Sequence, residues 1–117
     1  MRRVFALVLA LVATPALAQP AGKALFDGNC ADCHGLDAAS TYTAPTLKGV
    51  VGRKIASLGD FNYSDGLKAK AGGTWTDSTL DAFLADPKAF APGVQMFAAE
   101  PDPAKRRAII DYLKTVK

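Results

Sequence analysis

Apolar residues recur at helical spacing near both ends of the chain, whereas the middle of the chain shows no sustained period. The clearest predicted helix lies at the C-terminus, where Asp102 can act as the N-cap and Pro103 suits the first turn. A second terminal helix is predicted over about residues 21–31, with Pro20 tolerated at its start. The residues expected to form the buried stripe of the C-terminal helix are Ala108, Ile109, Tyr112, Leu113 and Val116.

Two shorter helices are predicted between these ends. Ser64 can cap a helix that runs through about Ala71, where two glycines follow. Thr76 can begin the next helix, which Pro87 would end. One apolar face of this helix would be formed by Leu80, Phe83 and Leu84.

The rest of the chain is predicted to consist of loops. Residues 35–60 carry glycines and Pro45 without a regular period, and Pro92-Gly93 marks a turn further on. No run alternates apolar and polar residues as a half-buried strand would. The pattern therefore predicts an all-α protein of three to five helices, and loops this long in a small domain indicate that they wrap something.

The first residues have the composition of a targeting segment. A basic start precedes an apolar run from Val4 to Val12, and Ala16-Leu17-Ala18 has the small residues that signal peptidase requires. We therefore expect residues 1–18 to be a cleaved signal peptide and residues 19–117 to form a single domain in the periplasm. An uncleaved membrane anchor is the alternative, although the apolar run is short for a membrane span.

Charge and size narrow the possible functions. The chain has 117 residues and a net charge of +3, which falls to about +1 when Arg2 and Arg3 leave with the signal peptide. A nucleic-acid-binding protein would carry a basic face, so this class is excluded. The remaining domain is small enough to be marginally stable, and one bridge between its two cysteines would constrain little of the chain. A large apolar cofactor would supply the missing core.

The cofactor is indicated by the segment Cys30-Ala31-Asp32-Cys33-His34. Cys-x-x-Cys-His is the attachment signal for c-type haem. The two thiols add to the haem vinyl groups, and the following histidine coordinates the iron as proximal ligand. Cys30 and Cys33 are therefore the predicted attachment residues of one covalently bound haem c. His34 is the only histidine, so no other residue competes for the proximal position.

Two other chemistries use related motifs. A thiol–disulfide redox site would pair Cys30 with Cys33, and His34 would lower a thiol pKa, but such sites belong to a βαβ context that this sequence does not offer. A zinc site would need a second pair of cysteine or histidine ligands, which the sequence lacks. Of the three, a haem site fits the sequence best.

The sixth iron ligand is predicted to be Met96, the only methionine outside the predicted signal peptide. Methionines commonly fill gaps in a core, yet this one follows Pro92-Gly93 on a loop downstream of the haem motif. Ligation by His34 and Met96 would fill both axial positions of the iron. If Met96 does not ligate, the protein would instead be a haem enzyme or a ligand sensor with an open sixth site.

Over residues 20–117 the chain resembles the class I cytochromes c, the mitochondrial and alphaproteobacterial type. Gly22 and Phe26 match positions on the first helix of that family that pack against the last helix at Tyr112. The segment 86–96 is similar to the family loop that carries the methionine ligand. The resemblance implies the cytochrome c fold, with helices and long loops around one haem.

The resemblance also implies roles for four residues around the haem. Pro45 lies in a segment similar to the family loop whose proline carbonyl accepts the N–H of the proximal histidine, here His34. Such a bond fixes the imidazole tautomer and makes the ring a better donor to the metal. Arg53, Tyr63 and Trp75 occur in the family's order and would surround the haem propionates with donors, since a buried charge without partners is costly.

Three residues depart from the family pattern. Phe83 stands where the mitochondrial proteins have a tyrosine that hydrogen-bonds near the methionine sulfur. Val94 replaces a threonine of the methionine loop, and Gln95 replaces a lysine. The first two changes remove hydroxyl groups from the Met96 side of the haem. The third, with the near-neutral charge, argues against a strong ring of docking lysines.

By resemblance, the protein is expected to be a single-haem electron carrier and not an enzyme. An iron with both axial positions filled has no open site for a substrate. The implied donor is a cytochrome bc-type complex, and the implied acceptor is an oxidase, a photosynthetic reaction centre or a reductase. We expect a monomer whose partners bind transiently at the exposed haem edge.

Overall fold

The computed structural model describes residues 9–10 and 18–117, with the side chains of residues 9–10 and 21–117. Its helices are α1 (Ala18–Asn29), α2 (Asp65–Lys68), α3 (Asp77–Ala85), α4 (Pro87–Phe90) and α5 (Pro103–Leu113). This described part of the chain has no β-strand, only isolated bridges that join Lys54 to Thr74 and Ala71 to Gly73. The predicted all-α class is confirmed.

The predicted signal peptide falls almost entirely outside the described residues. Among the described residues, none of the helices has the length and apolar character needed to cross a membrane.

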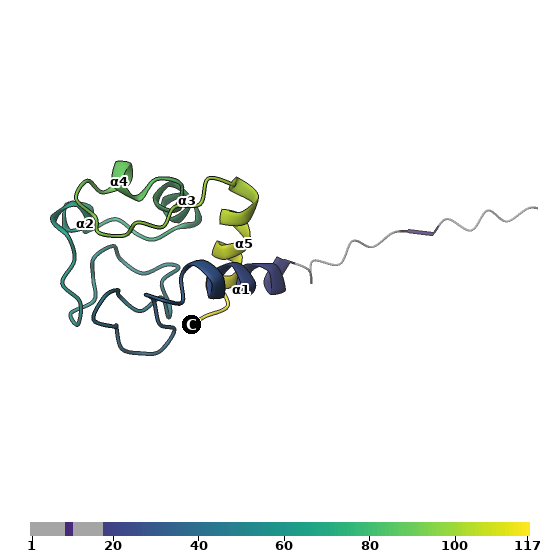
Figure 1. Cartoon of the computed structure of the whole chain (residues 1–117), viewed down its shortest axis with the longest axis horizontal. Helices are drawn as coiled ribbons and strands as arrows, with labels where there is room; N and C mark the ends of the chain where they lie inside the picture. Colours follow the sequence, from purple (N-terminus) through teal and green to yellow (C-terminus); the bar gives the residue numbers. More distant parts are fainter. Residues whose placement is uncertain (1–8, 11–17) are drawn as a thin grey trace, which may run out of the picture.

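The two terminal helices, α1 and α5, pack against each other and join the two ends of the domain (Figure 1). Gly22 allows the helices to approach closely, because a Cβ at this position would overlap the carbonyl oxygen of Ala108 and lie 2.8 Å from Cβ of Tyr112. One turn later, Phe26 is buried and its ring centroid lies 5.6 Å from that of Tyr112. The predicted contact of Gly22 and Phe26 with the last helix is confirmed.

The helix caps that the sequence predicts are present. The side-chain oxygen of Ser64 accepts a hydrogen bond from the main chain at the start of α2, and Thr76 does the same for α3. Asp102 caps α5 by accepting from the backbone N–H of Ala104 at 2.9 Å. These short-range bonds explain why the helix starts were predictable, since each satisfies N–H groups that the first turn leaves without partners.

Two helix predictions were wrong in detail. α2 ends at Lys68 and not near Ala71, because the following residues form tight turns. Pro87 does end α3, but it also begins a further single turn, α4, that was not predicted. Asp86 makes this possible by accepting a hydrogen bond from the backbone N–H of Ala89 at 3.2 Å, while Pro87 occupies the first turn, where its missing N–H costs nothing.

The buried face of α5 is broader than the predicted stripe. Ile109 and Leu113 are buried as expected, but Ile110 is also only 3 % exposed, whereas Ala108 and Val116 are half-buried. The reason is that α5 packs against α1 and also against α3. A helix with neighbours on two sides buries more than one stripe of its surface.

Candidate haem-binding site

The attachment motif begins directly after α1. The backbone N–H groups of Cys33 and His34 both donate to the carbonyl oxygen of Cys30, at 3.2 and 2.9 Å, so the motif forms a tight turn. Cys30 is half-buried and packs against the core, whereas Cys33 is exposed, and both are free thiols. The turn thus brings the two sulfur atoms and His34 to one end of the helix, as attachment to a single flat group requires.

The electrostatics of Cys30 do not suit thiol–disulfide chemistry. Burial, aided by the neighbouring Cys33, raises the pKa of the Cys30 thiol to about 11. A redox-active Cys-x-x-Cys pair instead needs a lowered thiol pKa, because the thiolate is the nucleophile. This environment argues against the thiol-redox hypothesis.

His34 lies against Pro45, with 2.8 Å between Nδ1 of the imidazole and the proline carbonyl oxygen. A carbonyl can only accept, so Nδ1 carries the proton and Nε2 keeps its lone pair. Burial is the main effect that lowers the pKa of His34, and the charge of Arg53 lowers it further, whereas the hydrogen bond to Pro45 raises it. The neutral imidazole with a free Nε2 is the form that a metal ion requires.

Two threonines that the sequence analysis did not identify hold the surrounding loop in place. Thr41 donates through its hydroxyl to the carbonyl oxygen of Cys33 at 2.8 Å. Thr46, only 3 % exposed, directs its hydroxyl to the carbonyl oxygens of Gly35 and Asp37. Neither role could be predicted, because a threonine in a long loop is usually exposed and only its three-dimensional neighbours distinguish it.

Arg53 lies next to Trp75 in the structure. The backbone N–H of Trp75 donates to the carbonyl oxygen of Arg53 at 2.8 Å. The side chains of Trp75 and Tyr63 are both buried. Arg53 donates from Nη2 to the carbonyl of Thr46 at 2.8 Å and from Nη1 to that of Lys48 at 3.2 Å. Its Nε is buried and has no partner among the described residues.

This unsatisfied nitrogen tests whether the residues fit the propionates of a haem. A buried donor without an acceptor costs free energy, and a positively charged donor costs more. Burial accordingly lowers the pKa of Arg53, which nearby Tyr63 and Asp60 partly offset. The Tyr63 oxygen accepts from the backbone N–H of Leu58 at 3.3 Å, so its hydroxyl hydrogen remains available. An anionic group beside Arg53 would accept hydrogen bonds from the Nε–H of Arg53 and from the hydroxyl of Tyr63.

The Met96 side of the site is apolar. Met96 is half-buried and packs against a core cluster that contains Phe83 and Val94, two of the three departures from the family pattern. Trp75 belongs to the same cluster, and its ring centroid lies 5.2 Å from that of Phe83 and 5.7 Å from that of Phe90. The loss of hydroxyl groups inferred from the sequence therefore falls within a buried, aromatic part of the molecule.

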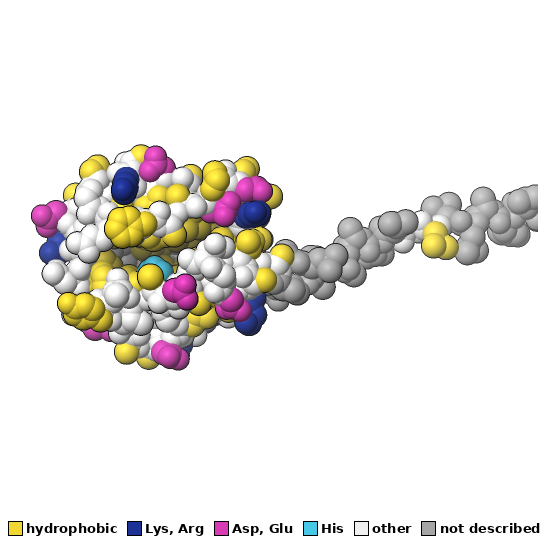
Figure 2. Space-filling model, viewed as in Figure 1, with side chains coloured by type: hydrophobic (Ala, Val, Ile, Leu, Met, Phe, Trp, Pro, Cys, Tyr) yellow, Lys and Arg dark blue, Asp and Glu magenta, His cyan; other side chains and the backbone are white. Residues whose placement is uncertain are grey.

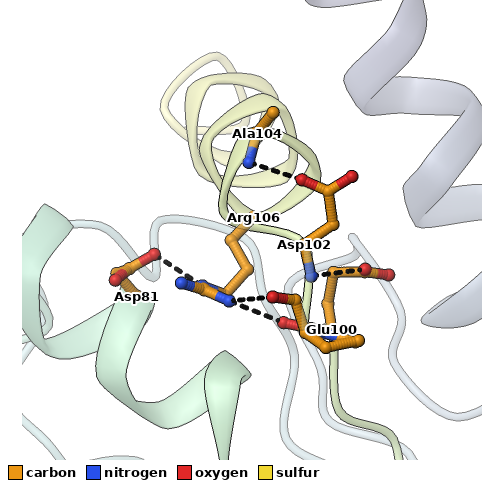
Figure 3. Close-up of polar contacts among 6 residues, drawn as sticks. Asp81, Glu100, Asp102, Ala104 and Arg106 are labelled. Carbon is orange, nitrogen blue, oxygen red and sulfur yellow. Dashed lines mark hydrogen bonds and ion pairs between the residues drawn. The ribbon is translucent and has the colours of Figure 1, made fainter.

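The loop that carries Met96 is fixed at both ends. At its start, Val94 donates to the carbonyl of Ala91 at 3.0 Å, and at its end Glu100 donates to the carbonyl of Leu84 at 2.8 Å. Arg106 of α5 reinforces the second attachment. Its Nε lies 2.7 Å from Oδ1 of Asp81 in α3, and its Nη1 donates to the carbonyls of Glu100 and Pro101, at 2.9 and 3.0 Å (Figure 3).

A space-filling view shows the domain hollowed on one face, with hydrophobic side chains around the hollow and the histidine visible inside it (Figure 2). This histidine is His34, the only one in the chain. The two thiols, a neutral imidazole, an apolar wall that includes Met96 and an unsatisfied arginine donor together match the needs of a covalently attached haem.

Comparison with known proteins identifies the family of the chain. The family model described as cytochrome c matches residues 20–117. Cytochrome c2 iso-2 of Magnetospirillum molischianum is 42% identical over 99 residues, which cover 84% of this chain and 97% of the relative. Cytochrome c-550 of Ancylobacter novellus is 40% identical over 100 residues, covering 82% and 94%. The solved structure of cytochrome cH from Methylobacterium extorquens has a TM-score of 0.74 and 42% identity, covering 83% of this chain and 97% of that one.

Proposed function

Because the chain belongs to the cytochrome c family, we propose that it carries single electrons between redox partners in the periplasm, with His34 and Met96 as the axial ligands of its haem. Membership of the family makes it a single-haem electron-transfer protein with covalently attached haem c. The ligands, the compartment and the partners are the proposal.

The observation that carries the proposal is the contact of His34 Nδ1 with the carbonyl of Pro45 at 2.8 Å. It directs Nε2 away from the loop and holds the ring in one orientation, as a ligand on a metal requires. Met96 is supported by its position on an anchored loop whose neighbours are apolar. No other methionine is present downstream of the motif.

When bound, the haem iron supplies a one-electron couple between Fe(III) and Fe(II). The residues of the chain set the conditions for this couple. The Met96 thioether is a soft donor that favours Fe(II), and the buried Phe83 and Val94 exclude water, which disfavours additional positive charge. The soft thioether and the exclusion of water both raise the reduction potential of the iron. Arg53 and Tyr63 would hold the propionates.

The proposed route of maturation begins with export. Residues 1–18 would direct the precursor out of the cytoplasm, and cleavage after Ala18 would leave Gln19 as the first residue of a domain that spans 19–117. Mass spectrometry of the purified periplasmic protein tests this. A mass that includes the first 18 residues would contradict it and favour the uncleaved membrane anchor.

The proposed partners are membrane redox complexes. A cytochrome bc-type complex would donate, and an oxidase, a photosynthetic reaction centre or a reductase would accept. Each contact would be small and transient, because a carrier that dissociates slowly from one partner cannot reach the next.

Absorption spectroscopy tests the ligands. The full precursor would be expressed in a host with haem-maturation machinery, and the periplasmic protein examined in both oxidation states. We expect a haem spectrum that resists acid-acetone extraction, with the weak far-red band of Fe(III)–methionine sulfur ligation. Met96→Ala should abolish this band, whereas Gln95→Ala, an exposed neighbour on the same loop, should keep it.

The other outcomes separate the alternatives. Covalent haem without the far-red band in the wild type, together with tight binding of exogenous ligands, would indicate a sensor or enzyme with an open sixth site. Protein without haem and with a reducible Cys30–Cys33 bridge would indicate thiol redox chemistry.

A further inference from the structure

We infer that this carrier docks its partner through two exposed aromatic side chains, Tyr42 and Phe97, and that the partner therefore presents an apolar face and not an acidic one. The inference rests on the proposed function, because it concerns the surface through which the carrier would exchange electrons. It concerns the chemistry of the partner's surface and leaves open which complex carries it.

The two aromatic side chains are unusually exposed. Tyr42 is 101 % and Phe97 86 % exposed, and no other large hydrophobic side chain from residue 21 onward is classed as exposed. Single exposed apolar residues are common and need no explanation. Here, however, the domain buries its other large apolar side chains at least in part and exposes two aromatic rings, the residue type that is enriched where interfaces form.

Both rings lie next to the residues of the haem site. Tyr42 is at the tip of a short loop that Thr41 closes by donating from its backbone N–H to the carbonyl of Ala44 at 3.0 Å. The Thr41 hydroxyl ties this loop to the carbonyl of Cys33 at 2.8 Å. Phe97 directly follows Met96, and the next two residues are exposed alanines. Tyr42 is thus tied to the attachment end of the site and Phe97 adjoins its methionine end.

The charges on this face do not favour an acidic partner. Asn29 and Gln95, which flank the same two ends, are exposed and uncharged, and Asp32 is an exposed carboxylate within the attachment motif itself. The Nζ of Lys88 lies 5.7 Å from the centroid of the Phe97 ring, so its charge interacts with the ring face. Lys88 is opposed by Asp32 and by Asp60, whose carboxylate binds Ser40 two residues before Tyr42. These charges give little net attraction to an acidic surface, whereas burying two aromatic rings gives a large apolar contribution.

Protein-film voltammetry of the holoprotein tests the inference on defined surfaces. Gold electrodes would be coated with alkanethiols that end in methyl or carboxylate groups. We expect tight electroactive adsorption on the methyl surface that changes little between low salt and about 1 M salt, where screening acts within roughly 3 Å. The double variant Tyr42→Ala/Phe97→Ala should bind the methyl surface roughly tenfold more weakly, the loss expected when aromatic anchors are removed.

Matched variants separate an apolar contact from charge or misfolding. Tyr42→Phe/Phe97→Leu keeps two large apolar groups and should adsorb like the wild type, and so should Lys88→Gln. Each variant should keep the far-red band. Stronger, salt-sensitive adsorption on the carboxylate surface would overturn the inference while leaving the proposed function intact. A wild type without a reversible one-electron wave would overturn the proposed function and the inference with it.

Two other occupants of the aromatic surface would also overturn the inference. If the rings bind a second copy of the chain, sedimentation will show a dimer that the double alanine variant lacks. If they bind a membrane, the wild type will float with phosphatidylcholine vesicles and the double variant will not. We expect the wild type to remain monomeric and to stay free of the vesicles.

Discussion

Gly66 of α2 lies directly against the carbonyl oxygen of Pro92, four residues before Met96. A Cβ at this position would overlap that oxygen and would lie 2.9 Å from the carbonyl carbon of Ala91 and 3.0 Å from that of Pro92. All three are backbone atoms, so none can rotate away. The missing side chain of Gly66 therefore determines how closely the methionine loop approaches α2.

We predict that Gly66→Ala displaces the methionine loop while leaving the haem attached. The added methyl group must push the backbone at Pro92, which should weaken or remove the far-red band of Met96 ligation and destabilise the protein by about 1–3 kcal/mol. Spectra and urea unfolding measure both effects. Gly28→Ala is the control, because a Cβ there meets nothing within 4 Å and a helical alanine is favourable. Equal far-red bands in the two variants would refute the steric role of Gly66.

Arg106 offers a test of the anchor at the other end of this loop. Arg106→Lys keeps the charge but loses the planar fork that reaches Asp81 and the carbonyls of Glu100 and Pro101. The free energy of unfolding should fall by about 1–3 kcal/mol, because carbonyls lose their donors and the half-exposed ion pair adds little. The neighbouring Arg107 is exposed, so Arg107→Lys should have an effect near zero. Similar losses in both variants would argue against the anchor.

Acid should weaken the loop around the attachment motif through Asp60. Its carboxylate accepts hydrogen bonds from the backbone N–H and the hydroxyl of Ser40, at 2.8 and 2.7 Å, and these bonds lower the pKa of Asp60. A lowered pKa in the folded state stabilises the protein above the ordinary aspartate pKa of about 3.9, and the contribution is lost as the pH falls through the folded value.

Denaturant unfolding between about pH 2 and pH 5 measures this contribution. Asp60→Asn should make the unfolding free energy less dependent on pH in that range, and Ser40→Ala should have a smaller effect of the same sign. A variant with the pH dependence of the wild type would show that the Ser40–Asp60 contact does not contribute to acid stability.

The chain without haem is predicted to be largely unfolded. The core is small, and residues 30–63, between α1 and α2, contain no helix or strand of their own. We expect the Cys30→Ala/Cys33→Ala protein, prepared free of haem, to show weak helical circular dichroism and no cooperative thermal transition. A sharp melting transition in that protein would contradict the prediction.

Features that depend on neighbours in the sequence were predictable. The caps at Ser64, Thr76 and Asp102 involve residues two or three positions apart, so the local sequence alone indicates them. The haem motif is similarly local. The contact of Gly22 with the last helix was found only through resemblance to a family, because nothing in the sequence of one helix identifies its distant partner.

Features that depend on distant neighbours were missed. Thr46 is buried because its hydroxyl lies against the carbonyls of Gly35 and Asp37, which precede it by 11 and 9 residues. Ile110 is buried because a second helix covers it. The same applies to Gly66, whose role follows from a backbone that passes within contact distance. α4 was overlooked for a different reason, since Pro87 both ends one helix and begins another.

The crossing of α1 and α5 has a consequence for how the protein is made. Phe26 cannot bury its ring until α5 has been synthesised, since its partner Tyr112 lies at the far end of the domain. At about 5–20 residues per second, the ribosome needs on the order of ten seconds to extend the chain from one helix to the other. During that interval the Cys-x-x-Cys-His segment remains in an open chain, in a form that can be threaded across a membrane. The contact between Phe26 and Tyr112 can therefore form only after the last helix has been made.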